Sequence, residues 1–424
     1  MTNLYDYQQR AVDAIVERKR LGLFLGMGLG KTLITLTAIA RLDVKALVIA
    51  PLRVARYTWS QENEKFNIGL RVSVCVGNER QRREALDVDA DIYVINRDMT
   101  TWLFEQKRLP AWSMLVVDES TSFKNPGSKR WRTLKKQKFD RVLLLTGTPV
   151  ANNLLDLWAQ VYLLDRGARL ETCVTRYRQK YFYLYRTINN VPIYKDPFPW
   201  AKDRILELIK DITVTMRSED YLQLPPFRII DQRIDIPVMR EYEEMKREYV
   251  YDHITAANAA VVLGKCQQIA NGFLYGSELR HAEKVDAVKE LLEIGEPLLV
   301  YYTYEEDKRR LLELGGVEIT DENIEAWNRG EIKMLVAHPQ AAGLGLNLQA
   351  GGHVIVWYSM PWSYELYSQG IARLYRPGQR QKVVVYRLIA SGTVDEIVAE
   401  TLEHKQSVSD SLLDTLKREY TRCK

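Results

Sequence analysis

Short apolar runs alternate with longer mixed stretches through the first 165 residues of the chain. The runs are nearly continuous Val, Ile and Leu, which indicates strands buried on both faces of a parallel sheet that helices cover. The strands predicted in this way span residues 21–25, 46–50, 71–76, 92–96, 114–118 and 142–146. The helices predicted among them span residues 7–19, 33–40 and 54–66.

The alternation breaks between residues 166 and 281, where helices are predicted only at 239–251 and 256–270. Residues 182–200 are rich in Tyr and Pro and are expected to form an irregular insertion. After residue 282 the alternation resumes and ends in a helical tail. The elements predicted there are strands at 298–302, 333–337, 354–357 and 383–388, and helices at 284–294, 305–314, 364–374 and 394–417. The two α/β blocks resemble each other, and such pairs bind ligands in the cleft between them.

Composition narrows the class of protein only slightly. The chain has 424 residues with 46% hydrophobic and 27% charged residues, as in globular proteins that do not enter a membrane. Its net charge of +5 permits a polyanionic partner without requiring one. The four cysteines form no Cys-x-x-Cys pair, so we expect neither a zinc site nor disulfides, and reduced thiols in a cytosolic compartment. We predict no signal peptide and no membrane span.

One glycine-rich stretch, Leu25-Gly26-Met27-Gly28-Leu29-Gly30-Lys31-Thr32, lies between a predicted strand and a predicted helix. Small residues let backbone N–H groups turn inward on an anion, and the helix N-terminus adds its positive dipole end. Lys31 can reach the outer phosphates of a nucleotide, and the Thr32 hydroxyl can ligate magnesium. The full P-loop pattern has a glycine where Leu25 stands, so this stretch needs support from other residues.

Two carboxylates, Asp118 and Glu119, end another predicted strand. We expect Asp118 to hold magnesium and Glu119 to polarise the water that attacks the γ-phosphate. A solvated acidic pair would be the alternative if no P-loop preceded it. The next strand ends in Thr146-Gly147-Thr148-Pro149, which either senses the phosphate state or forms a capped turn.

Two arginines, Arg373 and Arg376, stand three residues apart on a predicted helix and can therefore point the same way. A guanidinium binds phosphate oxygens bidentately, and an arginine that reaches the γ-phosphate from a second domain acts as a finger. A solvated basic helix end is the alternative.

These stretches, in this order, resemble the superfamily-two helicase-like ATPases and most closely their Swi/Snf-type branch. Residues 4–8 are similar to the adenine-reading Q motif, and residues 27–32 to motif I. The remaining matches are Ile49-Ala50-Pro51-Leu52 to motif Ia, Asp118-Glu119 with Lys124-Asn125 to motif II, Leu145–Pro149 to motif III, Pro225-Pro226 to the linking segment, residues 343–348 to motif V, and Gln369 to Gln379 to motif VI. The resemblance implies a minimal member of phage or bacterial type, in the cytoplasm of a bacterium or of an infected host.

The resemblance implies two RecA-like P-loop lobes with parallel sheets and a mainly helical insertion between them. The domains expected are lobe 1 over 1–165, a linking and helical region over 166–281, lobe 2 over 282–393 and a helical tail over 394–424. ATP and Mg²⁺ are the cofactors implied. The residues implied to bind the nucleotide are Tyr5, Gln8, Met27, Gly28, Leu29, Gly30, Lys31, Thr32, Gly345 and Gln369, with Thr32 and Asp118 on the metal.

The implied partner is double-stranded DNA, gripped through its phosphates without sequence reading. The positions that match the groove motifs of the family are Arg53, Asn96, Arg97, Lys124, Thr303, Asn347 and Trp362. The sequence departs from the branch at Leu25-Gly26, at Ser120-Thr121 and at Ser359–Trp362. Three functions remain open at this point: a duplex DNA translocase, a strand-separating helicase on DNA or RNA, and a DNA-binding module with weak ATPase. A protein partner is unknown.

Overall fold

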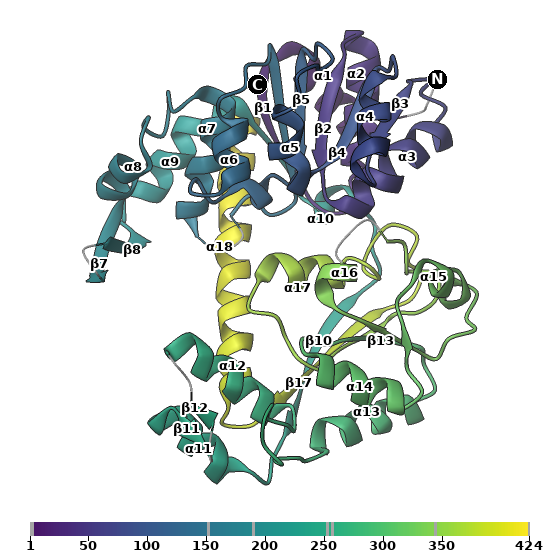
Figure 1. Ribbon diagram of the computed structural model, residues 1–424, viewed down its shortest axis with the longest axis vertical. Coiled ribbons are helices and arrows are strands. Elements are labelled where there is room, and N and C mark those ends of the chain that lie inside the picture. The colour runs from purple at the N-terminus through teal and green to yellow at the C-terminus, as the bar shows by residue number, and fades with distance from the viewer. Residues whose placement is uncertain are drawn as a thin grey trace. The chain divides into compact units, whose positions relative to one another are not determined.

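The computed structural model describes residues 4–150, 153–188, 191–251, 254–255, 258–342 and 346–422 (Figure 1). The chain divides into two compact units. Unit 1 comprises Met1–Leu222 with Ser407–Lys424, and unit 2 comprises Gln223–Gln406. In the described part of the chain, no helix combines the length and the apolar character that crossing a bilayer requires.

Unit 1 is built on a sheet of seven strands, in which every neighbouring pair is parallel. Its order is β3 (Val72–Cys75), β4 (Ile92–Asn96), β2 (Ala46–Ala50), β5 (Met114–Asp118), β6 (Arg141–Thr146), β1 (Arg20–Leu25) and β9 (Thr213–Met216). Six of these strands lie where the apolar runs predict them. Six of the seven strands, all except β3, are buried over all or nearly all of their length. This burial explains why β1, β2, β4, β5 and β6 are apolar between their ends. The seventh strand, β9, was not predicted.

Helices connect the strands of unit 1. They are α1 (Asp6–Glu17), α2 (Lys31–Leu42), α3 (Trp59–Lys65), α4 (Glu79–Asp87), α5 (Thr100–Phe104), α6 (Lys129–Leu134), α7 (Leu157–Asp165) and α10 (Ser218–Tyr221), with short 3₁₀ turns at 97–99, 120–123, 154–156 and 210–212. The single helix predicted over 54–66 is observed as a π-helical turn, Val54–Thr58, that continues into α3. A reciprocal cap starts α4, because Asn78 and Gln81 each accept from the backbone N–H of the other.

The prediction of an irregular insertion over 182–200 is wrong, because this segment forms an antiparallel hairpin. Its strands are β7 (Phe182–Ile188) and β8 (Val191–Pro197), paired with register shifts along β7. Helices α8 (Val174–Tyr181) and α9 (Ala201–Ile209) flank the hairpin. We call residues 174–204 the hairpin extension; its strands project away from the sheet of unit 1 (Figure 1).

Unit 2 contains a second sheet, of six parallel strands. Its order is β10 (Phe227–Ile234), β17 (Val383–Ala390), β16 (Val354–Trp357), β13 (Leu298–Tyr301), β15 (Met334–Ala337) and β14 (Val317–Glu318). The fold class predicted from the sequence is therefore confirmed. The region 166–281 contributes one strand to each sheet, β9 to the first and β10 to the second.

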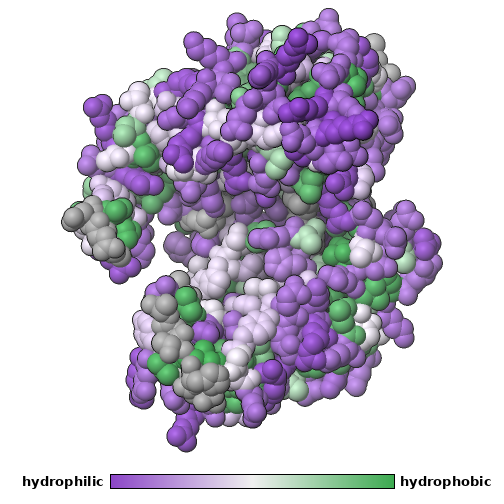
Figure 2. Space-filling model, viewed as in Figure 1, coloured by the Kyte–Doolittle hydropathy of each residue, from purple (hydrophilic) through white to green (hydrophobic). Residues whose placement is uncertain are grey.

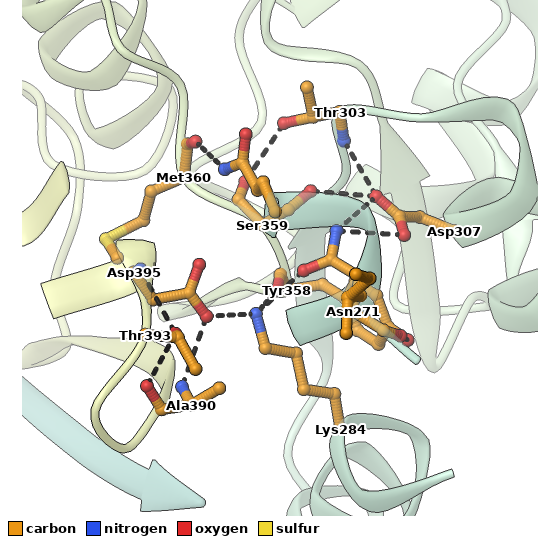
Figure 3. A network of polar contacts seen from close by, with 12 residues as sticks. Asn271, Lys284, Thr303, Asp307, Tyr358, Ser359, Met360, Ala390, Thr393 and Asp395 are labelled. Atoms are coloured by element: carbon orange, nitrogen blue, oxygen red, sulfur yellow. Dashed lines mark hydrogen bonds and ion pairs between the residues drawn. The ribbon is translucent and has the colours of Figure 1, made fainter. Parts of the chain in front are cut away.

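The remaining elements of unit 2 are mostly helices. They are α11 (Met239–Glu248), α12 (Ala259–Ala270), α13 (Glu283–Glu293), α14 (Glu305–Glu313), α15 (Asp321–Asn328), α16 (Pro339–Ala342), α17 (Tyr364–Ile371) and the first part of α18 (Val394–Arg422), with a small ribbon of β11 (Val250–Tyr251) and β12 (Ile254–Thr255). The part of α18 from Ser407 onward belongs to unit 1. A buried ion pair joins α13 to the start of α18: Lys284 Nζ lies 2.6 Å from Asp395 Oδ2, and both side chains are fully buried (Figure 3).

Candidate ATP site and nucleic-acid contacts

The strand order of unit 1 brings the candidate nucleotide-binding segments to one edge of the sheet. Strands β5, β6, β1 and β9 are successive neighbours, and the carboxyl ends of parallel strands face the same way. In the register, Asp118 pairs with Leu145, Thr146 with Phe24, and Leu25 with Met216. The glycine-rich loop, the carboxylates and the Thr146–Pro149 segment therefore leave the sheet at adjacent positions.

The glycine-rich loop spans residues 26–30, between β1 and α2. Gly28 and Gly30 have φ of +83° and +79°, which L-residues with a side chain rarely adopt, so the conformation accounts for both glycines. Leu25, which stands where the P-loop pattern has its first glycine, is the last residue of the buried strand β1. The chain is still extended at this position, and the turn of the loop begins after it. The ammonium of Lys31 folds back on the loop, where it donates to the carbonyls of Leu25 (3.0 Å) and Gly26 (3.5 Å).

Gln8, at the start of α1, holds this loop from the side. Its Nε2 donates to the Leu29 carbonyl at 3.3 Å, and its Oε1 accepts from the Tyr5 N–H at 3.1 Å. A Cβ added to Gly30 would lie 2.7 Å from that Nε2, which is a second reason for a glycine there. Gln8 is buried, whereas Tyr5 exposes 68% of its surface and stacks on Tyr7. The structure thus brings Gln8, Met27–Gly30, Lys31 and Thr32 together.

The two carboxylates differ in environment. Asp118 is buried; burial raises the pKa of its carboxyl, and the nearby charge of Lys31 opposes that rise. Glu119 is half-buried and has a φ of +52°, a left-handed conformation that is strained for a residue with a side chain. Strain of this kind is concentrated at functional sites. The Glu119 N–H donates to Asp118 Oδ1 at 3.1 Å.

Gln160 on α7, which none of the sequence motifs includes, links the strand ends of β5 and β6. Ser120 Oγ donates to Gln160 Oε1 at 2.8 Å, and Gln160 Nε2 donates to the Pro149 carbonyl at 2.8 Å. Gln160, Ser120 and Thr146 are fully buried. A glutamine amid the apolar residues of Leu157–Leu164 was the available signal. The segment after β6 also approaches the loop, since a Cβ added to Gly147 would lie 3.7 Å from Lys31 Nζ.

The departure at Gly26 has a packing cause within unit 1. A Cβ at Gly26 would lie 2.3 Å from Ser218 Oγ and 2.7 Å from the Ser218 backbone nitrogen, so no larger residue fits. Ser218 Oγ donates to the Met27 carbonyl at 2.7 Å, and the Gly26 N–H donates to the Met216 carbonyl at 2.9 Å. The segment after β9 therefore braces the glycine-rich loop.

Four of the positions expected to contact nucleic acid lie in unit 1. Arg53 follows β2, Asn96 ends β4, and Arg97 begins the next turn, so all three are at the carboxyl edge of the sheet. Asn96 is buried and its side chain accepts from the Asp98 N–H at 3.3 Å, whereas both arginines are half-buried. Lys124 forms an ion pair with Asp156 at 3.6 Å.

In unit 2, Arg373 and Arg376 converge on one acceptor. Arg373 Nη1 and Arg376 Nη1 donate to the Leu346 carbonyl at 3.2 and 2.8 Å. The prediction that both lie on a helix is wrong, because α17 ends at Ile371 and the backbone continues in shorter turns. Gln369 is buried and its carbonyl accepts from Arg373 Nε at 3.0 Å. Gly345 lies outside the described residues.

Thr303 belongs to a buried polar network around Asp307 (Figure 3). Asp307 Oδ2 accepts from the Thr303 N–H (3.3 Å) and from Ser359 Oγ (2.9 Å), and Asn271 Nδ2 donates to both carboxylate oxygens at 3.1 Å. Burial raises the pKa of Asp307 to about 6, and hydrogen bonds from the Tyr304 N–H, the Ser359 hydroxyl and the Thr303 N–H oppose the rise. Ser359, a departure from the branch, thus donates to this network.

The other two unit 2 candidates, Asn347 and Trp362, make different contacts. Asn347 is exposed, and its carbonyl accepts from Asn328 Nδ2. Trp362 is half-buried, and its carbonyl accepts from Lys405 Nζ at 2.8 Å. Both positions stay predictions as nucleic-acid contacts.

No group of three or more His, Cys, Asp or Glu side chains that could hold a metal ion occurs among the described residues. The Thr32 hydroxyl and the Asp118 carboxylate are nevertheless hard oxygen donors. Mg²⁺ prefers such donors, and it takes few of them from protein when phosphates supply the rest. The donor set therefore fits a nucleotide-bound magnesium ion.

Comparisons with known proteins agree with the sequence patterns. A model of the SNF2-related domain matches residues 7–175, and a model of the helicase conserved C-terminal domain matches residues 316–378. A solved structure described as the Sulfolobus solfataricus SWI2/SNF2 ATPase core in complex with dsDNA is 23% identical, with a TM-score of 0.47, and covers 100% of this chain and 95% of that one.

Three curated relatives extend over nearly the whole chain. "Putative protein p41" of Acyrthosiphon pisum secondary endosymbiont phage 1 is 30% identical, covering 97% of this chain and 98% of its own. "Putative ATP-dependent helicase/translocase YwqA" of Bacillus subtilis is 26% identical, covering 92% of this chain and 46% of its own. The human SWI/SNF-related matrix-associated actin-dependent regulator of chromatin subfamily A member 1 is 27% identical, covering 95% and 42%. The chain spans less than half of the last two, and it belongs to the SNF2-related family of helicase-like ATPases.

Proposed function

We propose that this protein is a DNA-dependent ATPase that moves along double-stranded DNA without separating the strands. The observation that carries the proposal is the convergence, at one edge of the unit 1 sheet, of the glycine-rich loop, Lys31, Asp118, Glu119 and Gln8. This set provides a phosphate cradle, a cation, a metal-binding carboxylate and a base beside each other.

The roles follow from the environment of each side chain. Gln8, which bonds to Leu29 and Tyr5, would read adenine, and the backbone N–H groups of the loop would bind phosphates. Lys31 would exchange its carbonyl acceptors for phosphate oxygens. Glu119, held in a strained conformation, orients the attacking water. Arg373 and Arg376 supply two guanidinium groups, a type of group that binds phosphate oxygens bidentately.

Magnesium would be held by Thr32 and Asp118, and when bound it neutralises charge on the phosphate oxygens. The pKa of Asp118 is raised by burial and kept lower by Lys31, so a cation beside this carboxylate favours its charged form.

Duplex DNA as the track is supported by the Swi/Snf-type motifs and by the name of the Bacillus relative, a helicase/translocase. Contacts to phosphates suffice for stepping along an intact duplex, because they need no exposed bases. The phage and bacterial relatives support a place in the cytoplasm of a bacterium or of an infected host.

A strand-separating helicase is the second candidate, because the hairpin extension exposes aromatic side chains. Two assays with ATP discriminate: displacement of a third strand from a triplex, and unwinding of a tailed duplex. We expect triplex displacement without unwinding, and ATP turnover that duplex DNA stimulates more than single-stranded DNA or RNA. Efficient unwinding without triplex displacement would establish the helicase instead. A protein without any ATP turnover would be a DNA-binding module.

A further inference from the structure

The hairpin extension carries a net positive charge. Residues 174–204 contain seven Lys and Arg and two Asp, a net charge of +5, which equals the net charge of all 424 residues. The rest of the chain is therefore neutral in sum. Positive charge on a protruding element favours an anionic ligand at that element.

The same element exposes aromatic rings among the charges. Tyr183, Tyr185 and Trp200 expose 50%, 58% and 52% of their surface. Arg186 and Lys195 lie 5.4 and 5.5 Å from the centre of the Tyr185 ring. Figure 2 shows hydrophobic and hydrophilic surface side by side over β7 and β8. Because a two-stranded hairpin builds no core of its own, these exposed rings are available to a ligand.

A cavity of about 590 Å³ lies at the base of the extension, within unit 1. The turn 167–172, helix α8 and helix α9 surround it, and its charged and aromatic lining includes Arg176, Lys180, Tyr181, Trp200 and Arg204. Cavities of 300–1,000 Å³ hold small organic ligands, so one nucleotide fits this volume.

The Lys and Arg side chains that line the cavity are of two kinds, those with a carboxylate partner and those without one. Lys180 is bound to Glu171 at 2.6 Å, and Arg169 is bound to Asp211. In the part of the chain that the structure describes, Arg176 and Arg204 have no carboxylate partner, and both are exposed. Two guanidinium groups without a carboxylate, beside an exposed indole, match the phosphate and the base of a nucleotide.

We propose that the hairpin extension binds single-stranded nucleic acid, with one unpaired nucleotide in this cavity. Arg176 and Arg204 contact its phosphate, its base stacks on Trp200, and the strand continues along Tyr183 and Tyr185. The inference rests on the proposed function, since it gives the motor a contact for a single-stranded tail beside the duplex.

The test measures binding of the full chain to fluorescent oligothymidine over a series of salt concentrations. Arg176→Gln/Arg204→Gln removes both contacts to one phosphate, so the slope of log K against log salt should become less steep by about 0.7, the value for one phosphate on a single strand. Trp200→Ala should weaken binding roughly 5- to 150-fold, the range for losing one base–aromatic stack, and Trp200→Phe should restore most of it.

The matched control is Arg80→Gln/Arg83→Gln, which removes two exposed arginines of α4 and should leave both affinity and slope unchanged. An unchanged slope in the Arg176/Arg204 variant, or competition by polyglutamate as strong as by oligothymidine, would overturn the proposal. Stimulation of ATP turnover by blunt duplex DNA is measured in parallel. If duplex DNA stimulates turnover of the parent protein but the cavity variants bind oligothymidine as the parent does, only this inference fails. If duplex DNA has no effect on turnover of the parent protein, the proposed function fails.

Discussion

Replacing Gln160 with leucine should uncouple the segment after β5 from the segment after β6. The amide of Gln160 accepts from Ser120 Oγ and donates to the Pro149 carbonyl, both at 2.8 Å, inside the core of unit 1. Leucine fills a similar volume but can neither donate nor accept. The substitution therefore leaves a buried hydroxyl and a buried carbonyl without these partners.

The size of the effect follows from those two groups. Each buried polar group left unsatisfied costs about 1–3 kcal/mol, and the apolar leucine offsets part of the total. We expect a net loss of about 2–4 kcal/mol, which is a fall of about 4–16 °C in the unfolding temperature of a unit of this size. Because Ser120 directly follows Glu119, a small displacement of that carboxylate should also lower ATP turnover by about 10- to 100-fold.

Ser120→Ala offers the sharpest check, since it removes the orphaned hydroxyl. Added to Gln160→Leu, it should recover about 1 kcal/mol or more, whereas alone it should destabilise. Unfolding is followed by tryptophan fluorescence and by hydrogen exchange of peptides from β5 and β6. Gln137→Leu is the control, because within the described parts of the chain its side chain bonds only to the Thr133 carbonyl of α6. Parental stability and turnover in Gln160→Leu would refute the coupling.

Other predictions concern single side chains. Lys31→Ala should weaken nucleotide binding and abolish turnover, whereas Glu119→Gln should bind ATP and lose turnover; parental rates in either would contradict the site assignment. Arg376→Ala should keep ATP binding and slow hydrolysis by a factor of roughly 10³–10⁵. Arg376→Lys should not restore the rate, because an ammonium lacks the planar fork of a guanidinium. A loss of less than about tenfold in Arg376→Ala would show that Arg376 is only a surface charge. Burial raises the pKa of Asp307 from 3.8 to about 6, so the native state holds the proton more tightly than the unfolded state. Its carboxyl should therefore lower stability by about 2 kcal/mol as pH rises from 4 to 7, a slope that urea titrations of Asp307→Asn should lack.

The parts of the fold that the sequence predicted are those whose signal is local. Strands β2, β4, β5 and β16 agree residue for residue with their predicted spans, because burial on both faces leaves polar residues only at the carboxyl ends of β4 and β5. The glycines at 28 and 30 were interpretable because their backbone conformation requires them.

The parts that the sequence did not predict depend on partners far along the chain. Strand β10 is mostly exposed or half-buried and carries Arg and Asp, so only its pairing with β17 makes it a strand. The hairpin β7–β8 lacks a buried face and was mistaken for irregular sequence. Arg373 and Arg376 were predicted to converge through helical spacing, but a shared carbonyl acceptor at Leu346 brings them together.

The three departures from the Swi/Snf-type pattern are each matched by a contact with a distant residue. Gly26 is required by Ser218, Ser120 bonds to Gln160 forty positions away, and Ser359 bonds to Asp307 fifty-two positions away. At each of these three positions, the residue that departs from the motif contacts a distant residue that belongs to none of the motifs. Gln160 satisfies Ser120 and Pro149 at once, which ties the carboxylate segment to the segment after β6 through neutral hydrogen bonds. An assembly of this kind can transmit a displacement without an ionisable group, so we expect the coupling between these segments to be insensitive to pH.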